Sequence, residues 1–188
     1  MCQFLSVLVL KNGDILSHPM LDSHSDLVAH FQLPDNDEFI HHFAKAELTP
    51  VDWLDSSTWQ WRIDEPTRPG WLDEVESLAE AKARALAQRM VITEASVIPR
   101  LIVDGCWIIG GKAVVRDVRG GRILRVQDSA QVSDVRDSAQ VSDVRGSARV
   151  SDVRGSARVS NVWGSARVSD VGLNVVLDAS AKAHLVAP

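Results

Sequence analysis

Cys2 is the residue best suited to nucleophilic chemistry, because removal of Met1 would place its thiol beside a free α-amino group. Hydrolases with an N-terminal nucleophile use such a pair as nucleophile and base. They also need an oxyanion hole, and the folds known to support this chemistry are larger than the N-terminal domain expected here. A cysteine packed at the end of a strand is the simpler interpretation. With Cys106 as the only other cysteine, no disulfide framework is expected.

The histidines form a second group that could do chemistry, and five of the six lie at positions 18, 24, 30, 41 and 42. None has the spacing of a zinc site, so we expect no metal and no cofactor. On a strand, His41 and His42 would point to opposite faces. A small enzyme that uses Cys2 or His41/His42, next to Asp52 and Asp55, is therefore the alternative to a non-enzymatic protein.

Tryptophans are candidates for binding. Trp53, Trp59, Trp61 and Trp71 lie close together in the sequence, and Trp59 and Trp61 would share one face of a strand. Such a cluster can form an aromatic binding platform or the core of a small domain, and the core is the simpler interpretation. Trp163 replaces an arginine at an outward position of a repeat and would stack on Arg145, as a partner contact or a cation–π pair.

The C-terminal half repeats one nonapeptide: DSAQVSDVR at 128–136 and 137–145, GSARVSDVR at 146–154, GSARVSNVW at 155–163 and GSARVSDVG at 164–172. The arginines at the fourth position of three units, Arg149, Arg158 and Arg167, form the one candidate basic row for binding nucleic acid. The units lack the paired glycines of calcium-binding nonapeptides, so the aspartate is read as a turn residue and no calcium is expected.

The spacing of the apolar residues predicts a parallel β-solenoid. Alanine at position three and valine at position five suit one face of a strand, and the step of three to the next valine predicts a bend at Ser-Asp. A second bend is expected at Arg-Gly-Ser. Two units would make one turn, so that Val132, Val150 and Val168 stack in one ladder and Val141 and Val159 in another. An antiparallel β-meander is the alternative.

The N-terminal half predicts a small α+β domain over residues 1–98, followed by the solenoid over 101–188. Residues 3–18 read as a hairpin turning at Asn12-Gly13. A short helix with a capping box at Ser23 and Asp26 follows, then strands at 38–48 and 58–64. Residues 69–92 give a long helix with Trp71, Val75, Leu78, Leu86 and Met90 at helical spacing. We expect the helices to cover one face of an antiparallel sheet.

Charge supports a boundary near residue 100, where Pro99 also lies. Residues 1–100 contain 16 acidic against 8 basic residues, and residues 101–188 contain 9 against 12. Neither half is basic enough to indicate a nucleic-acid-binding protein. No apolar run reaches the length of a membrane span, and no secretory signal is evident, so we expect a cytoplasmic protein without membrane contact.

The segments MCQFLSVLVLKNGDIL, SHSDLVAHFQL and GCWIIGGKA, with the A-x-V-x-x-V nonapeptides, resemble an uncharacterised family of bacterial and bacteriophage proteins. The resemblance implies a phage or mobile-element origin and no known activity. Together with the repeats, it favours a non-enzymatic binding or scaffold protein. Its head domain would bind a host or phage protein or a small ligand, and its solenoid would act as a stalk or interaction surface. Homo-oligomers are plausible through the ends of the solenoid.

Overall fold

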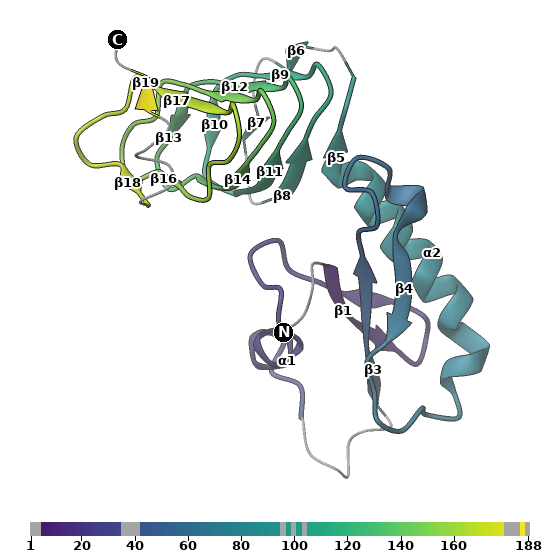
Figure 1. Cartoon of the computed structure of the whole chain (residues 1–188). Coiled ribbons are helices and arrows are strands. Elements are labelled where there is room, and N and C mark those ends of the chain that lie inside the picture. Colours follow the sequence, from purple (N-terminus) through teal and green to yellow (C-terminus); the bar gives the residue numbers. More distant parts are fainter. Residues whose placement is uncertain are drawn as a thin grey trace. The chain divides into compact units, whose positions relative to one another are not determined.

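The computed structural model describes residues 5–34, 42–94, 97–98, 101–102, 105–178 and 185–186 (Figure 1). The chain divides into two units, Met1–Arg89 and Met90–Pro188. The division falls before the boundary near residue 100 that charge suggests, because Val91–Ile92 and Val97–Ile98 already pair with strands of the solenoid. Pro99 lies outside the described residues.

A four-stranded antiparallel sheet forms the centre of the N-terminal unit. Its strands are β1 (Leu5–Leu10), β2 (Ile15–Leu16), β3 (Phe43–Thr49) and β4 (Gln60–Ile63), in the order β2-β1-β3-β4. The predicted hairpin is confirmed: Leu8 pairs with Leu16, and Gly13 in the turn has a φ of 75°. The strand expected from residue 38 starts at Phe43 in the described part of the chain, and residues 38–41 lie outside it.

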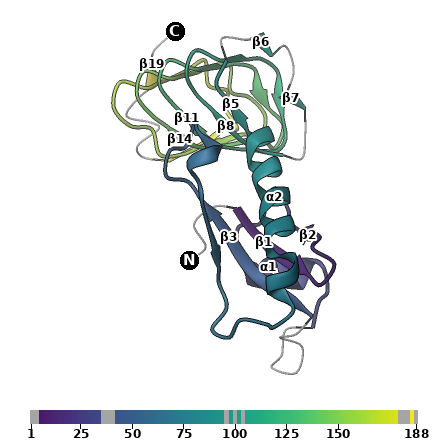
Figure 2. The ribbon, with the colours of Figure 1, turned by 90° about the vertical axis from the view of Figure 1, so that its right-hand side faces the viewer.

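Helices cover both faces of this sheet. Helix α1 (His24–His30) packs Leu27 and Val28 on the face that carries Leu8 and Phe43. Residues on the opposite face, Val7 and Val9 among them, are also fully buried, and Figures 1 and 2 show the sheet between α1 and α2 (Leu72–Met90). The expectation of helices on one face is wrong. A strand that is apolar at consecutive positions, such as LSVLVL, is buried on both sides.

The helix ends and faces differ in detail from the prediction. Ser23 is the N-cap residue of α1, but its side chain makes no capping hydrogen bond. The helix predicted at residues 69–92 is found at Leu72–Met90 as α2, whereas Val91–Ile92 form a strand of the solenoid. Its most buried positions are Leu72, Ala79, Ala83 and Ala87, whereas Leu78 is 49% exposed. The small alanine side chains allow the helix to approach closely, so the face with the largest apolar residues is not the one that is most buried. A short 3-10 helix, η1 (Ser56–Thr58), precedes β4.

The C-terminal unit is a parallel β-solenoid of about 5 turns over residues 91–186. The strand pairings among its described residues are all parallel, which excludes the antiparallel meander. One six-stranded sheet has the order β18-β16-β14-β11-β8-β5, a second has the order β19-β17-β15-β12-β9-β6, and a three-stranded sheet has the order β13-β10-β7. The strands of the first are Val91–Ile92 (β5), Cys106–Ile109 (β8), Arg122–Val126 (β11), Gln140–Val144 (β14), Arg158–Val159 (β16) and Val176–Leu177 (β18). Those of the second are Val97–Ile98 (β6), Val114–Val115 (β9), Gln131–Val132 (β12), Arg149–Val150 (β15), Arg167–Ser169 (β17) and Leu185–Val186 (β19). Those of the third are Leu101–Ile102 (β7), Val118–Arg119 (β10) and Val135–Arg136 (β13).

The predicted repeat of two units per turn is confirmed. Val132 pairs with Val150 and Val150 with Val168, while Val141 pairs with Val159 in the other sheet. The third-position alanines Ala130, Ala148 and Ala166 are buried at 0%, 0% and 2% exposure. Small side chains stacked at every rung therefore form the dry interior of the coil.

Both predicted bends occur. The glycines that begin three units have φ of 65–70°, and the residue after the sixth-position serine has φ of 52° at Asp134 and Asp152. These left-handed backbones are accessible to glycine, aspartate and asparagine. Asp143 is the exception, because β14 continues through it and its carboxylate pairs with Arg125 of β11 at 3.3 Å.

Candidate functional site on the solenoid

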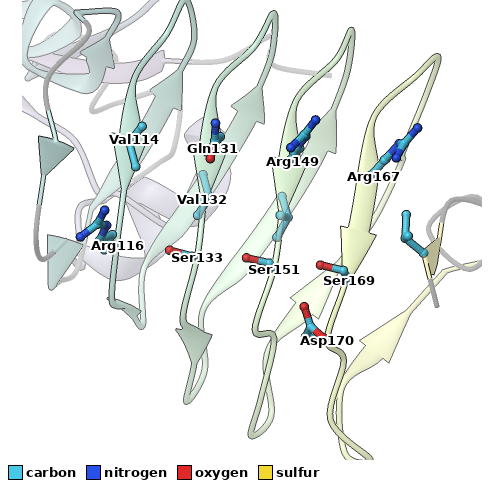
Figure 3. A pocket seen from close by; sticks show the side chains of 12 residues that line it. Val114, Arg116, Gln131, Val132, Ser133, Arg149, Ser151, Arg167, Ser169 and Asp170 are labelled. Carbon is cyan, nitrogen blue, oxygen red and sulfur yellow. The ribbon is translucent and has the colours of Figure 1, made fainter. Parts of the chain in front are cut away.

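One face of the solenoid carries two parallel columns of polar side chains (Figure 3). Its strands are β12, β15 and β17, in which the fifth-position valine points inward and the residues on either side point outward. The fourth position supplies Gln131, Arg149 and Arg167. The sixth position supplies Ser133, Ser151 and Ser169. We call these six residues the Arg–Ser face.

The Arg–Ser face is part of a concavity of about 510 Å³. All six residues line it, and Arg116, which precedes the serine column by one turn, extends its basic character. Asp170 lies at its edge (Figure 3). The concavity therefore combines guanidinium groups, hydroxyl groups and one carboxylate over neighbouring rungs of a rigid sheet.

The arginines of the repeats fall into two classes. Those at the ninth position pair with the aspartate two residues earlier: Arg136 with Asp134 at 3.1 Å and Arg154 with Asp152 at 3.1 Å. The same pattern precedes the repeats, where a hydrogen bond from the Arg119 side chain to Asp117 raises the pKa of Arg119. These pairs offset the negative charge of Asp134 and Asp152, which lie one turn apart in the solenoid.

The fourth-position arginines belong to the second class. Within the described ranges, Arg149, Arg158 and Arg167 have no ion pair with a carboxylate. Arg149 is directly in register with Arg167, so two exposed guanidinium groups lie on strands about 4.8 Å apart. Like charges in register are unfavourable, and a bound anion would relieve the repulsion. An arginine can hold a carboxylate with two parallel hydrogen bonds.

The three arginines expected as one row do not lie on one face. Arg158 is in β16, in register with Gln140 and Val176 of the other six-stranded sheet. Consecutive units alternate between the two sheets, so only units two apart share a face. The basic row is therefore a pair, Arg149 and Arg167. Arg158 occupies the same repeat position in the other six-stranded sheet.

Trp163 is the ninth residue of its repeat unit and directly follows Val162, which forms a parallel bridge with Val144. Its side chain is 53% exposed. The guanidinium of Arg145, its neighbour one turn earlier, pairs with Asp143 at 2.9 Å. Trp163 is thus an exposed apolar group on the solenoid, separate from the Arg–Ser face.

The four tryptophans of the predicted cluster differ in burial within the N-terminal unit. Trp59 is 1% exposed, and its indole N–H donates to the carbonyl oxygen of Asp52 at 2.7 Å. Trp61 is half-buried and donates to Glu76 at 3.0 Å. Trp53 and Trp71 are also half-buried. Trp59 therefore belongs to the core, whereas the other three tryptophans of the cluster are only partly buried.

The residues of the enzyme alternative do not assemble in the described part of the chain. Cys2 and His41 lie outside the described residues, and His42 is exposed. Asp52 accepts from the backbone N–H of Leu54, and Asp55 caps η1. Both aspartates therefore have local structural roles in a turn.

Sequence reasoning missed Gln131, Arg116 and the serine column. The available signal was the sixth position of the repeat, which is serine in all five units, at 133, 142, 151, 160 and 169. Reading this position with the period of two units would have placed three of these serines beside Arg149 and Arg167.

Comparisons with known proteins show no match to any family model, curated protein or solved structure. Among the described residues, no helix combines the length and apolar character needed to cross a membrane.

Proposed function

We propose that this chain is a non-enzymatic binding protein whose solenoid recognises an acidic segment of a partner protein through the Arg–Ser face. The observation that carries the proposal is the register of Arg149 on Arg167, two exposed guanidinium groups without a carboxylate partner in the described structure. The repeats supply a rigid sheet that holds the two groups at a fixed spacing, which reduces the entropic cost of binding.

The serine column supports the choice of a peptide segment. Hydroxyl groups both donate and accept, so Ser133, Ser151 and Ser169 can satisfy the backbone groups of a bound chain. The arginines next to them would bind its carboxylates. The concavity of about 510 Å³ provides room for several side chains of such a segment.

A nucleic acid fits this surface less well than an acidic protein. The described residues that line the concavity include no aromatic side chain on which a base could stack. The solenoid as a whole has nearly balanced charge, whereas binding to nucleic acid is dominated by contacts to many phosphates.

The remaining parts of the function stay predictions. They are a phage or mobile-element origin, a cytoplasmic location, and a partner bound by the N-terminal domain. Self-association is supported by the exposed apolar side chains of Leu173, Val176 and Leu185 in the last described turns. Light scattering of the purified chain would contradict self-association if it showed a strict monomer.

The test compares two charge reversals of the same kind on different sheets. Immobilised wild-type chain, Arg149→Glu/Arg167→Glu and the control Arg158→Glu are incubated with host lysate, and the retained proteins are quantified by mass spectrometry. We expect acidic proteins that the wild-type chain and Arg158→Glu retain equally and that the double variant loses by about tenfold or more.

Arg158 occupies the same position of the repeat as Arg149 and Arg167, and the single variants Arg149→Glu and Arg167→Glu match Arg158→Glu in net charge. Equal loss with Arg158→Glu would indicate a response to net charge alone and would contradict the proposal. Retention of nucleic acid rather than protein, sensitive to the double variant, would assign the face to a different class of ligand.

A further inference from the structure

A buried polar cluster lies between α1 and the sheet of the N-terminal unit, independent of the Arg–Ser face. It contains His24 at the start of α1, Glu47 in β3 and Asp64 just after β4. His24 is 5% exposed and Glu47 is 3% exposed, whereas the side chain of Asp64 is 39% exposed. Solvent therefore reaches the cluster at Asp64, whereas His24 and Glu47 are buried.

The hydrogen bond of His24 determines which ring nitrogen faces the carboxylates. Nε2 lies 2.9 Å from the carbonyl oxygen of Ala46, which can only accept, so Nε2 carries the hydrogen. In the neutral ring the lone pair is then on Nδ1, which lies 3.4 Å from Oδ2 of Asp64. Histidines that bind metals commonly donate their other N–H to a backbone carbonyl in this way.

Arg62 pairs with one oxygen of Glu47 and with one oxygen of Asp64. Its guanidinium contacts Oε2 of Glu47 at 2.9 Å and Oδ1 of Asp64 at 3.3 Å. Arg62 and Glu47 are cross-strand neighbours in β4 and β3, so the pairing of the sheet sets this contact. The Asp64 oxygen that faces His24 is the one that Arg62 does not contact.

The distance between Nδ1 of His24 and Oδ2 of Asp64 is compatible with two ligands of one ion. A charged N–H···O⁻ hydrogen bond measures about 2.7–2.9 Å, which is shorter than the separation observed. Two ligand atoms at about 2.1 Å from a tetrahedral zinc ion lie about 3.4 Å apart, and Nδ1 and Oδ2 are 3.4 Å apart. One ligand atom from each of the three residues lies within 4.8 Å of the others, so small side-chain shifts would bring all three to an ion.

We propose that His24, Glu47 and Asp64 bind one divalent transition metal ion, with zinc as the best match. An imidazole and two carboxylates suit zinc, whose catalytic sites use three protein ligands and keep a further position open. The solvent-exposed side of Asp64 gives that position to water or a small ligand. Arg62 would act as the outer partner of both carboxylates.

The experiment uses the full chain without an affinity tag, stripped with chelator and titrated with zinc chloride by calorimetry. We expect one ion per chain by elemental analysis. We also expect a rise in the melting temperature, because zinc at about 100 times its dissociation constant shifts the unfolding equilibrium about 100-fold. Asp64→Asn keeps the shape of the partly exposed ligand and removes its charge, and it should weaken zinc binding by about tenfold or more.

His30→Gln is the control, because the rings of His18 and His30 lie 4.5 Å apart and could themselves bind zinc. The proposal requires that His30→Gln binds zinc as the wild-type chain does and that His24→Gln does not. If His24→Gln fails to fold, as judged by circular dichroism, Glu47→Gln and Asp64→Asn carry the test. Absence of stoichiometric zinc in the wild-type chain, or zinc binding that is lost only with His30→Gln, would overturn the proposal.

Discussion

At the scale of single residues, the repeats separate two uses of arginine by position within nine residues. A ninth-position arginine such as Arg154 and an aspartate such as Asp152 flank an inward valine and pair with each other. A fourth-position arginine such as Arg149 flanks the other inward valine, where the nearest outward neighbour is a serine. Both positions hold arginine, but only the fourth-position arginine has a guanidinium group that can pair with an anion of a binding partner.

A second contact at this scale joins the hairpin turn to α2. Lys82 contacts Asp14 at 2.6 Å, and Asn12 donates to the same carboxylate at 2.7 Å. The hydrogen bond from Lys82, then that from Asn12, lowers the pKa of the Asp14 carboxyl below 3.8. A lowered pKa in the folded state stabilises the protein above the unfolded value, and this contribution is lost as the pH falls through the folded value.

We predict that Lys82→Gln moves the pKa of Asp14 back towards 3.8. An NMR titration of the side-chain carboxyl of Asp14 measures this directly. Lys11→Gln removes a charge from the same turn and should leave the pKa nearly unchanged. The contact would be refuted if the pKa of Asp14 were the same in the wild-type chain and in Lys82→Gln. Because the Asp14 side chain is 57% exposed and water screens the pair, the effect on stability should be small.

At the scale of elements, the alanine ladder sets the width of the solenoid. Ala130, Ala148 and Ala166 repeat every second unit and are buried. We predict that Ala148→Val destabilises the solenoid by about 1–3 kcal/mol, because the extra methyl groups have no space between neighbouring rungs. Ser147→Val places a similar side chain on the exposed neighbour and should change stability by less than about 0.5 kcal/mol.

Urea denaturation followed by circular dichroism measures both variants. Equal stability of Ala148→Val and the wild-type chain would mean that the interior is not closely packed.

The elements also show what the sequence could predict. The ladders, the hairpin at Gly13 and helix α2 followed from periodicity and turn chemistry, because these depend on neighbours in sequence. The two-sided cover of the sheet was indicated by the apolar residues at consecutive positions of Leu5–Leu10, a signal that the prediction of one covered face did not use. His24, Glu47 and Asp64 come from three elements, so their meeting depends on tertiary packing that no spacing encodes.

At the scale of the whole molecule, two repeat units contribute to the same face only when they are an even number of units apart. Deletion of residues 155–163 removes one unit and moves Arg167 to the sheet opposite Arg149. Deletion of residues 128–145 removes two units and leaves Arg149 stacked on Arg167. We predict that both proteins fold, because every unit supplies the same inward alanine and valines, and that only the two-unit deletion retains partners of the Arg–Ser face.

Circular dichroism checks that both deletions keep their strands, and the lysate comparison described for the charge reversals measures retention. Partner retention by the one-unit deletion, with the repeats folded, would show that the pairing of Arg149 with Arg167 is not required.

Site-specific photo-crosslinking tests the central claim most directly. A photoreactive amino acid replaces Ser151 on the Arg–Ser face or Ser160, which occupies the same repeat position in the other six-stranded sheet. The account predicts a crosslinked partner protein from position 151 that disappears in the Arg149→Glu/Arg167→Glu background, and no such product from position 160. Crosslinking of the same partner from both positions, or from 160 alone, would contradict it.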